Sequence, residues 1–214
     1  MIKKYFAGIL LLALMVSCKP KEELILIETD YGNMKIALYD STPIHKENFL
    51  KLAKEGYYDG TLFHRVISGF MIQGGDPESI GAPANKPLGA GGPGYTLENE
   101  IGAYHFKGTV AAARRGGPGN PEKRSSGSQF YIVQGKPVTE GQLNSMAQMK
   151  NITYSPEDIA RYTANGGTPF LDDDYTVFGE VVEGMDVIDK IAAVQTAPGD
   201  RPLKDVTMKV SVIK

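Results

Sequence analysis

Short stretches of alternating hydrophobic and polar residues recur along the chain, a pattern typical of β-strands with one buried face. Residues 24–30 and 34–39 are the first two, and the turn-forming residues 31–33 between them predict a hairpin. Residues 206–213 alternate in the same way and predict a strand near the end of the chain. Short apolar runs between glycine-rich loops predict further strands at residues 62–66, 70–73, 95–97, 109–113, 129–133 and 176–182.

Two segments repeat their apolar residues at helical spacing instead. In residues 42–56, Thr42 is the expected N-cap, Pro43 suits the first helical position and Gly56 ends the helix. Residues 185–193 form the second expected helix. Many short strands with two amphipathic helices predict a mainly β fold, an antiparallel barrel that is plugged at its ends.

Residues 138–168 interrupt this β pattern. Within them, residues 138–150 and 155–165 have helical character, and Ser155 followed by Pro156 is a typical helix start. We therefore expect a helical insertion in a loop of the barrel. A surface decoration that the fold tolerates and a role in gripping client polypeptides are both open interpretations.

The composition is that of a soluble globular domain. The 214 residues are 42% hydrophobic and 22% charged, which argues against a disordered or fibrous chain. This length suits one compact domain, or one domain with a decorated loop. The 25 glycines indicate many turns and so favour a β-rich fold. The formal net charge of -2 gives no reason to expect nucleic acid as a partner.

The first residues of the chain are typical of a targeting signal. Two lysines precede an apolar run at residues 5–16, which is shorter than the ~20 residues of a membrane span but suits a signal peptide. Ser17 and Cys18 follow, and Cys18 is the only cysteine. An intramolecular disulfide is therefore excluded.

The sequence around Cys18 resembles the bacterial lipobox, although Met15 stands where leucine is commoner. The resemblance implies that residues 1–17 are a lipoprotein signal peptide and that Cys18 becomes the lipidated first residue. Residues 18–23 then form a short tether to a domain at 24–214. The lipid would anchor the protein to a membrane of the bacterial cell envelope, facing the periplasm or the cell surface, without a spanning helix. An ordinary secretory signal with an incidental cysteine is the alternative.

Common catalytic templates are absent from the sequence. It contains no G-x-S-x-G and no H-E-x-x-H motif, and its three histidines are far apart. With Cys18 assigned to the anchor, little is left for a metal site, and we predict neither a metal nor a cofactor. Gly89, Gly91 and Gly94 match G-x-G-x-x-G, but Pro93 and the residues after it predict no helix, so the dinucleotide fingerprint is incomplete.

Four blocks of sequence stand out instead. They are FHRVISGFMIQGGDP at residues 63–77, GTVAAAR at 108–114, GSQFYI at 127–132 and FLDDDYTVFGEV at 170–181. In this order they resemble the cyclophilin family of peptidyl-prolyl cis-trans isomerases. The resemblance covers roughly residues 24–214, apart from 138–168 and part of 116–126.

The resemblance implies a fold and an activity. The family fold is a closed eight-stranded antiparallel β-barrel capped by two α-helices, to which this chain would add the helical insertion. The implied activity is rotation about X-Pro peptide bonds without a cofactor, and the implied partners are unfolded or partly folded proline-containing polypeptides. Together with the lipobox, this predicts a monomeric, membrane-anchored isomerase that assists the folding of exported proteins.

An isomerase of this kind needs an apolar slot for the proline ring and a fixed donor. The X-Pro bond rotates over a barrier of ~18–20 kcal/mol because the nitrogen lone pair is delocalised into the carbonyl. A donor that favours the pyramidal nitrogen of the twisted state lowers this barrier. Arg65 matches the family's catalytic arginine, and its permanently charged, planar guanidinium suits that role. Gln73 matches the glutamine that positions this arginine and the substrate carbonyl.

Alternation along residues 129–131 sends Gln129 and Tyr131 to one face of the strand and Phe130 to the other. Because the family's groove lies on the face of the first and third residues, we assign Gln129 and Tyr131 to the substrate site. Phe130 is assigned to the core. Tyr131 stands where the family often has Phe, so its hydroxyl needs a partner or water.

The remaining substrate contacts are assigned by the resemblance alone. They are Phe70 and Met71 in the proline pocket, Leu171 beside it, Ala113 and Arg114 as the pair whose backbone bonds the substrate chain, and Phe170 and Tyr175 at the groove. Arg114 replaces the family's Asn, Phe170 its frequent Trp and Tyr175 its frequent His. The absence of that tryptophan predicts weak cyclosporin binding.

A cyclophilin fold that only holds peptides, with little turnover, is the second functional hypothesis. His64, beside the catalytic arginine, is left without an assigned role, since a structural hydrogen-bonding role fits it equally well. The basic loop at residues 116–126 is expected to be solvated and flexible, with modulation of client choice as a further hypothesis.

Overall fold

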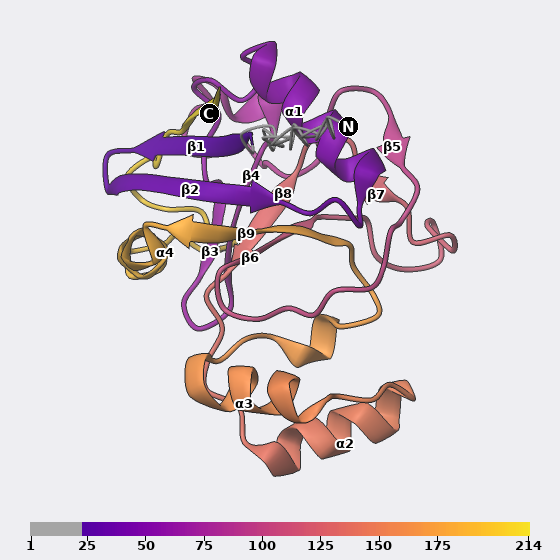
Figure 1. The fold of residues 1–214 in the computed structure, drawn as a ribbon. Coiled ribbons are helices and arrows are strands. Elements are labelled where there is room, and N and C mark those ends of the chain that lie inside the picture. Colours follow the sequence, from indigo (N-terminus) through magenta and orange to yellow (C-terminus); the bar gives the residue numbers. More distant parts are fainter. Residues whose placement is uncertain (1–22) are drawn as a thin grey trace, which may run out of the picture.

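The computed structural model describes residues 23–214, so the predicted signal peptide, Cys18 and most of the tether lie outside the described part. The strands are β1 (Leu24–Thr29), β2 (Gly32–Leu38), β3 (Arg65–Ile67), β4 (Met71–Gly74), β5 (Thr96–Leu97), β6 (Thr109–Ala112), β7 (Ser125–Ser126), β8 (Phe130–Val133), β9 (Val177–Glu183) and β10 (Lys209–Ile213). The α-helices are α1 (Pro43–Lys54), α2 (Glu140–Lys150), α3 (Pro156–Asn165) and α4 (Met185–Ala192), with 3₁₀ turns at Pro77–Ser79 and Pro169–Leu171 (Figure 1). No helix within residues 23–214 is long and apolar enough to cross a membrane.

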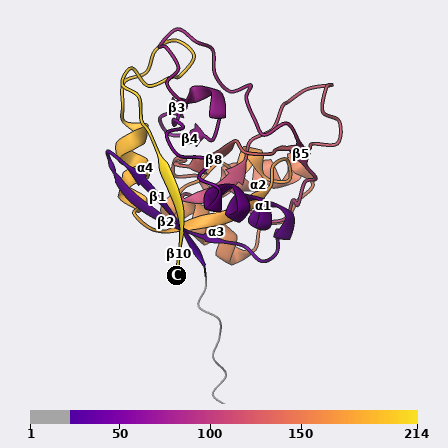
Figure 2. The same ribbon diagram turned by 90° about the horizontal axis from the view of Figure 1, so that it is seen from above.

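Eight strands form one antiparallel sheet that rolls around the core in the order β10-β1-β2-β9-β6-β8-β4-β3. The short strands β5 and β7 pair separately. In the large sheet β10 runs beside β1 (Figure 2), with Leu24 opposite Ile213. The two ends of the described chain therefore lie side by side.

The predicted eight-stranded fold is confirmed, although "closed" overstates the barrel slightly. The edge strands β3 and β10 do not pair with each other as strands. The seam is joined just before them, where Leu62 bridges Thr207 and Phe63 N donates to Val206 O at 2.9 Å. Because these residues bond across the seam and outside the main ladder, β3 and β10 each begin three residues later than the sequence pattern predicts.

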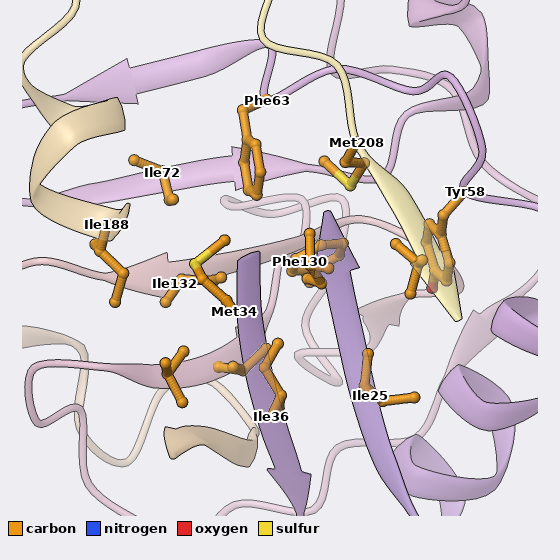
Figure 3. Close-up of a cluster of buried hydrophobic side chains, with 14 of the residues drawn as sticks. Ile25, Met34, Ile36, Tyr58, Phe63, Ile72, Phe130, Ile132, Ile188 and Met208 are labelled. Atoms are coloured by element: carbon orange, nitrogen blue, oxygen red, sulfur yellow. The ribbon is translucent and has the colours of Figure 1, made fainter. Parts of the chain in front are cut away.

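The inner face of the sheet is paired in register and carries the main core. Val66, Ile72, Ile132 and Val110 lie opposite one another across β3, β4, β8 and β6, and all are buried. Phe130 lies in the same cluster, as predicted (Figure 3). α1 packs against β9 and β10, and α4 against β2, β3 and β4, so both predicted helices cover this core.

The N-terminus of α1 is capped differently from the prediction. Thr42 occupies the N-cap position, but its side chain makes no capping hydrogen bond and donates to Tyr39 O at 3.3 Å. The carboxylate of Glu100 caps the helix instead, accepting from the Ile44 and His45 amides at 3.1 and 3.0 Å. A charged acceptor at this point satisfies two of the free amides and favours the positive end of the helix.

The predicted helical insertion is confirmed, and α2 and α3 lie together below the barrel in Figure 1. Thr139 and Ser155 each begin a helix with a capping box. Leu143 on α2 and Tyr162 on α3 are buried in a small cluster of their own, which includes Phe106 from the segment that leads into β6. The insertion is therefore packed onto the barrel by a shared apolar core.

Candidate active site

The site lies on the outer face of the sheet, opposite the main core. Arg65 on β3 pairs with Gln73 on β4, and Gln73 pairs with Tyr131 on β8. Tyr131 in turn pairs with Ala111 on β6. Because neighbours along a strand point to the other face, these residues form one row that brings a cation, an amide and an aromatic ring together.

A cavity of about 670 Å³ opens over this row. Its wall includes nine of the residues predicted for the site, namely Arg65, Phe70, Met71, Gln73, Ala113, Arg114, Tyr131, Leu171 and Tyr175. The other two predicted residues, Gln129 and Phe170, lie next to the cavity and are not part of its wall. Phe170 lies at the rim, 49% exposed, with its ring centroid 5.4 Å from that of Phe70.

Arg65 is held by a residue that the sequence pattern did not indicate. Asp200 Oδ2 accepts a hydrogen bond from Arg65 Nε at 3.3 Å, and Asp200 O accepts one from Val66 N at 2.8 Å. Within residues 23–214, the bond from Nε to Asp200 Oδ2 is the only hydrogen bond that the Arg65 guanidinium makes. Its two terminal NH₂ groups are therefore available to a bound chain, and the side chain is 43% exposed.

Gln73 is oriented by Gln129. Gln73 Nε2 donates to Gln129 Oε1 at 3.1 Å, and Gln129 Nε2 donates to Gly91 O at 2.7 Å. With its amide nitrogen used in this way, Gln73 presents its carbonyl oxygen as the acceptor at the cavity. Gln129 itself is buried, which explains why it acts behind the wall of the cavity.

The G-x-G-x-x-G sequence at residues 89–94 is arranged around an internal carboxylate. Asp76 is fully buried, and its Oδ2 accepts from the amides of Gly89 at 2.5 Å and Gly91 at 3.4 Å. Its Oδ1 accepts from the Glu78 amide at 2.8 Å. The amides that would cradle a phosphate in a nucleotide-binding loop thus face Asp76, and only the short strand β5 follows the motif.

The floor of the cavity is a second apolar cluster on the outer face of the sheet. It contains Met71, Ala111, Tyr131, Val133 and Val177, with Phe70, Leu171 and Tyr175 packed against it. A surface of this kind, beside a few polar groups, is typical of a pocket for a small apolar ring.

Only part of the backbone of Ala113 and Arg114 is free to bond to a substrate chain. Ala113 N donates to Gln129 O at 2.9 Å, and Ala113 O accepts from Ser126 N at 2.8 Å. The Arg114 backbone has no hydrogen-bond partner within residues 23–214 and is the part of the pair open to a substrate chain. Its guanidinium is engaged elsewhere, with Nε donating to Asp174 O at 2.9 Å.

The hydroxyl of Tyr131 finds a partner that sequence reasoning missed. Nε2 of His105 lies 2.9 Å from it, and the two rings are stacked with centroids 6.0 Å apart. Burial raises the pKa of Tyr131, so the hydroxyl stays protonated. His105 belongs to no recognisable motif, and only the tertiary structure brings it to Tyr131.

His64 lines the cavity beside Arg65 but does not make the hydrogen bonds that a structural role would need. Neither ring nitrogen has a hydrogen-bond partner in the described part of the chain. Burial lowers the pKa of His64, so the ring is neutral at pH 7. It lies close to the backbone of Gly89 and serves as part of the cavity wall.

Much of the remaining wall comes from two loops, residues 84–89 and residues 197–199 with Arg201. Arg201 joins them, since its NH₂ groups donate to Pro83 O at 2.8 Å and to Ala82 O at 3.0 Å. Neither loop has a periodic pattern, which is why sequence reasoning did not assign them.

The loop at residues 116–126 does not line the cavity. Hydrogen bonds hold part of it, because the Asn120 side chain accepts from Arg124 N at 2.9 Å and donates to Arg115 O at 3.1 Å. Lys123 Nζ also donates to Asp174 Oδ1 at 2.7 Å. These contacts tie the loop to the segment that carries Tyr175.

A rolled antiparallel sheet with an outward-facing arginine, an oriented amide and an apolar floor defines a peptide-binding barrel of the cyclophilin class. The model of the family "Cyclophilin type peptidyl-prolyl cis-trans isomerase/CLD" matches residues 24–212. The chain therefore belongs to the cyclophilin-type peptidyl-prolyl cis-trans isomerases, enzymes that rotate X-Pro peptide bonds.

Similar proteins agree with this assignment. Relatives from Staphylococcus haemolyticus and Staphylococcus saprophyticus, both named "Putative peptidyl-prolyl cis-trans isomerase", are 37% and 38% identical over 187 and 188 residues. In each case the match covers 86% of this chain and 88% of the relative. A Cryptosporidium parvum cyclophilin type isomerase is similar in structure, with a TM-score of 0.63 and 24% identity over 90% of this chain and 98% of that chain. The same parasite protein, solved in the presence of the dipeptide Ala-Pro, gives a TM-score of 0.62, 24% identity, and coverage of 89% and 99%.

Proposed function

We propose that Arg65 is the catalytic residue and that the cavity holds the proline ring of an X-Pro segment against Met71 and Tyr131. The row Arg65–Gln73–Tyr131 carries this proposal, because it places a donor, an oriented amide and an apolar floor side by side on one face of the sheet. Rotation about the X-Pro bond breaks no covalent bond. Catalysis therefore needs no nucleophile or metal, and a donor, an oriented amide and an apolar surface are sufficient.

Arg65 acts on the twisted state of the substrate. As the C–N bond rotates out of plane, the nitrogen lone pair loses its delocalisation and becomes a hydrogen-bond acceptor. The terminal NH₂ groups of Arg65 donate to it, an interaction that the planar cis and trans states do not offer, so the barrier falls. Asp200 fixes the plane of the guanidinium through Nε, and Gln73 accepts from the substrate or from Arg65.

The proposed substrates are proline-containing stretches of unfolded or partly folded polypeptides. The parasite relative that was solved in the presence of Ala-Pro supports this substrate class. The cavity here has the size of a small-ligand site. The unpaired Arg114 backbone at its edge offers a donor and an acceptor to an extended chain.

The decisive experiment measures cis-trans exchange of a short X-Pro peptide by NMR with the full-length chain and with Arg65→Ala. We expect the variant to lose about 100-fold or more of the acceleration, the effect of removing a transition-state donor. Arg115→Ala is the matched control, since Arg115 is exposed and lies outside the cavity wall. Full activity of Arg65→Ala would remove Arg65 from the mechanism. A folded parent that binds proline peptides without accelerating exchange would favour the peptide-holding alternative.

We also propose that the protein is a lipoprotein that assists the folding of exported proteins at the cell envelope. The signal-like residues 1–17 and the single cysteine that follows them support this proposal. Cys18→Ser should abolish labelling with a radioactive fatty acid and release the protein from the membrane fraction. Membrane association that survives Cys18→Ser would reject the lipid anchor.

A further inference from the structure

A buried chain of hydrogen bonds runs from the insertion to the floor of the cavity. At its centre is Asp172, which is fully buried. Asp172 Oδ2 accepts from the hydroxyls of Tyr154 and Tyr162, both at 2.7 Å. Oδ1 accepts from the amide and from Nδ1 of His105, both at 2.8 Å. Nε2 of His105 then meets the Tyr131 hydroxyl at 2.9 Å.

The chemistry of these groups sets the direction of every hydrogen bond. A carboxylate only accepts, so both tyrosine hydroxyls and Nδ1 of His105 donate to Asp172. Burial, followed by the charge of Asp172, raises the pKa of Tyr154 and of Tyr162, and both hydroxyls stay protonated. In the neutral form of the ring, a proton on Nδ1 leaves Nε2 as an acceptor for the Tyr131 hydroxyl. The chain therefore fixes the tautomer of His105 and the position of the Tyr131 ring.

The insertion also contacts Asp172 through α2. Lys150, the last residue of α2, donates to Asp172 O at 2.8 Å. Leu171, the neighbour of Asp172, lines the cavity. A buried carboxylate is costly unless hydrogen bonds compensate for lost water, and the insertion supplies two of the four hydrogen bonds that the Asp172 carboxylate accepts. Loss of either tyrosine hydroxyl would allow the Asp172 carboxylate to change position, and the His105 ring that is bonded to it would move as well.

We propose that Tyr154 and Tyr162 are positioning residues for the proline pocket, and that the insertion sets the Tyr131 ring through Asp172 and His105. Of these residues only Tyr131 touches the substrate, and the others act through it. This inference rests on the proposed function. It gives the insertion a role in the affinity of the pocket, in place of surface decoration or client gripping.

The proposal predicts a specific kinetic signature. The floor of the pocket contacts the proline ring in the planar and the twisted states alike, so loosening it weakens both equally. Such a loss of uniform binding raises KM and leaves kcat unchanged. A residue that merely stabilised the fold would lower the folded fraction, and therefore the apparent kcat, at constant KM.

The test uses the full-length chain with Tyr162→Phe, which removes one hydroxyl from Asp172. We expect KM for an X-Pro peptide to rise about two- to tenfold, the range of one ordinary hydrogen bond, with kcat unchanged. Tyr104→Phe is the matched control. The ring centroid of Tyr104 lies 4.9 Å from that of Tyr154. Its hydroxyl donates to Thr153 O at 2.9 Å and takes no part in the hydrogen bonds that lead from Asp172 to Tyr131. KM should stay at the parent value.

Two further measurements test the series of hydrogen bonds from Tyr162 to Tyr131 directly. The ring-nitrogen NMR resonances of His105 should shift in Tyr162→Phe and stay in place in Tyr104→Phe. In a Tyr131→Phe background, adding Tyr162→Phe should raise KM no further, because the link to the floor is already cut. An unchanged KM in Tyr162→Phe, or an additive effect in the double variant, would overturn the proposal.

The outcome is readable even where a variant or the main activity fails. If Tyr162→Phe does not fold, Tyr154→Phe removes the other hydroxyl from the same Oδ2 and carries the same expectations. If the parent shows no turnover, the proposed function fails, and the inference is then judged by the Kd of an Ala-Pro peptide in the same variants. A Kd that rises in Tyr162→Phe and not in Tyr104→Phe supports it, and equal values refute it.

Discussion

Gly91 is a position where the structure leaves no room for a side chain, next to Gln129, which orients Gln73. An added Cβ would overlap Asp76 Oδ1 and lie 3.0 Å from Glu78 Cγ. Asp76 cannot move aside easily, because it is fully buried and its carboxylate binds three backbone amides. The next residue gives a matched control, since a Cβ on Gly92 would meet only Ser128 Oγ, at 4.0 Å.

The magnitude follows from the bonds that Gly91→Ala must break. Losing one hydrogen bond to a charged group costs about 1.5–3 kcal/mol, and we expect the free energy of unfolding to fall by that amount. Gly92→Ala should change it by less than about 0.5 kcal/mol. Gly91 O also accepts from Gln129 Nε2 at 2.7 Å, and Gln129 orients Gln73. Loss of this neutral hydrogen bond predicts a fall in kcat/KM of about two- to tenfold.

Urea unfolding followed by circular dichroism measures the first effect, and the X-Pro exchange assay measures the second. Both variants are compared with the parent at the same pH and temperature. If Gly91→Ala unfolds at the same urea concentration as Gly92→Ala and has equal kcat/KM, then Asp76 gives way without cost and the steric argument is refuted.

Four other outcomes follow from the structure. Arg65→Lys keeps the charge but loses the planar set of donors, so turnover of an X-Pro peptide should fall by about tenfold or more at unchanged stability; equal turnover would count against the donor role. Phe130→Ala should lower the free energy of unfolding by about 3–5 kcal/mol in urea, because the core cannot fill the cavity that it leaves; a loss under about 1 kcal/mol would place the ring outside the tightly packed core. Burial alone would raise the pKa of Glu100, but the hydrogen bonds from His45 and from the start of α1 outweigh it and lower the pKa. The stabilisation from Glu100 is therefore complete above the unfolded value of about 4.3 and is lost as the pH falls through the folded value, and Glu100→Gln should remove that part of the acid dependence in pH-unfolding curves. Phe170→Trp should tighten cyclosporin binding in a fluorescence titration, and an unchanged Kd would show that the rim ring does not limit it.

Arg65, Gln73 and Tyr131 could be assigned to the site from the sequence because each lies in a block that resembles the cyclophilin family. Period-two alternation places Gln129 and Tyr131 on one face and Phe130 on the other, and the structure has Phe130 in the core and Tyr131 in the cavity wall. The sequence blocks around Arg65 and Gln73 fix the residue types on two neighbouring strands. The short turn between β3 and β4 then pairs Arg65 with Gln73, whereas the pairing of Gln73 with Tyr131 on β8 joins segments that are distant in sequence.

The supporting residues could not be predicted because their partners are distant in sequence. Asp200 lies 135 residues from Arg65 along the chain, and Glu100 lies 56 residues from the helix start that it caps. Neither belongs to a periodic element. A carboxylate in a loop is compatible with many partners, and only the folded chain selects one. The same holds for His105, whose two ring nitrogens meet Asp172 and Tyr131, 67 and 26 residues away along the chain.

The position of β1 within the sheet has a mechanical consequence. Its two neighbours, β2 and β10, bond to it along almost its whole length. A pull on the residues before Leu24, directed along the strand, would load both ladders in shear, so that many hydrogen bonds must yield together. The row Arg65–Gln73–Tyr131 lies on β3, β4 and β8, toward the other edge of the sheet. Tension applied at Leu24 would thus be carried by β1, β2 and β10. The strands β3, β4 and β8 would keep the geometry of the pocket.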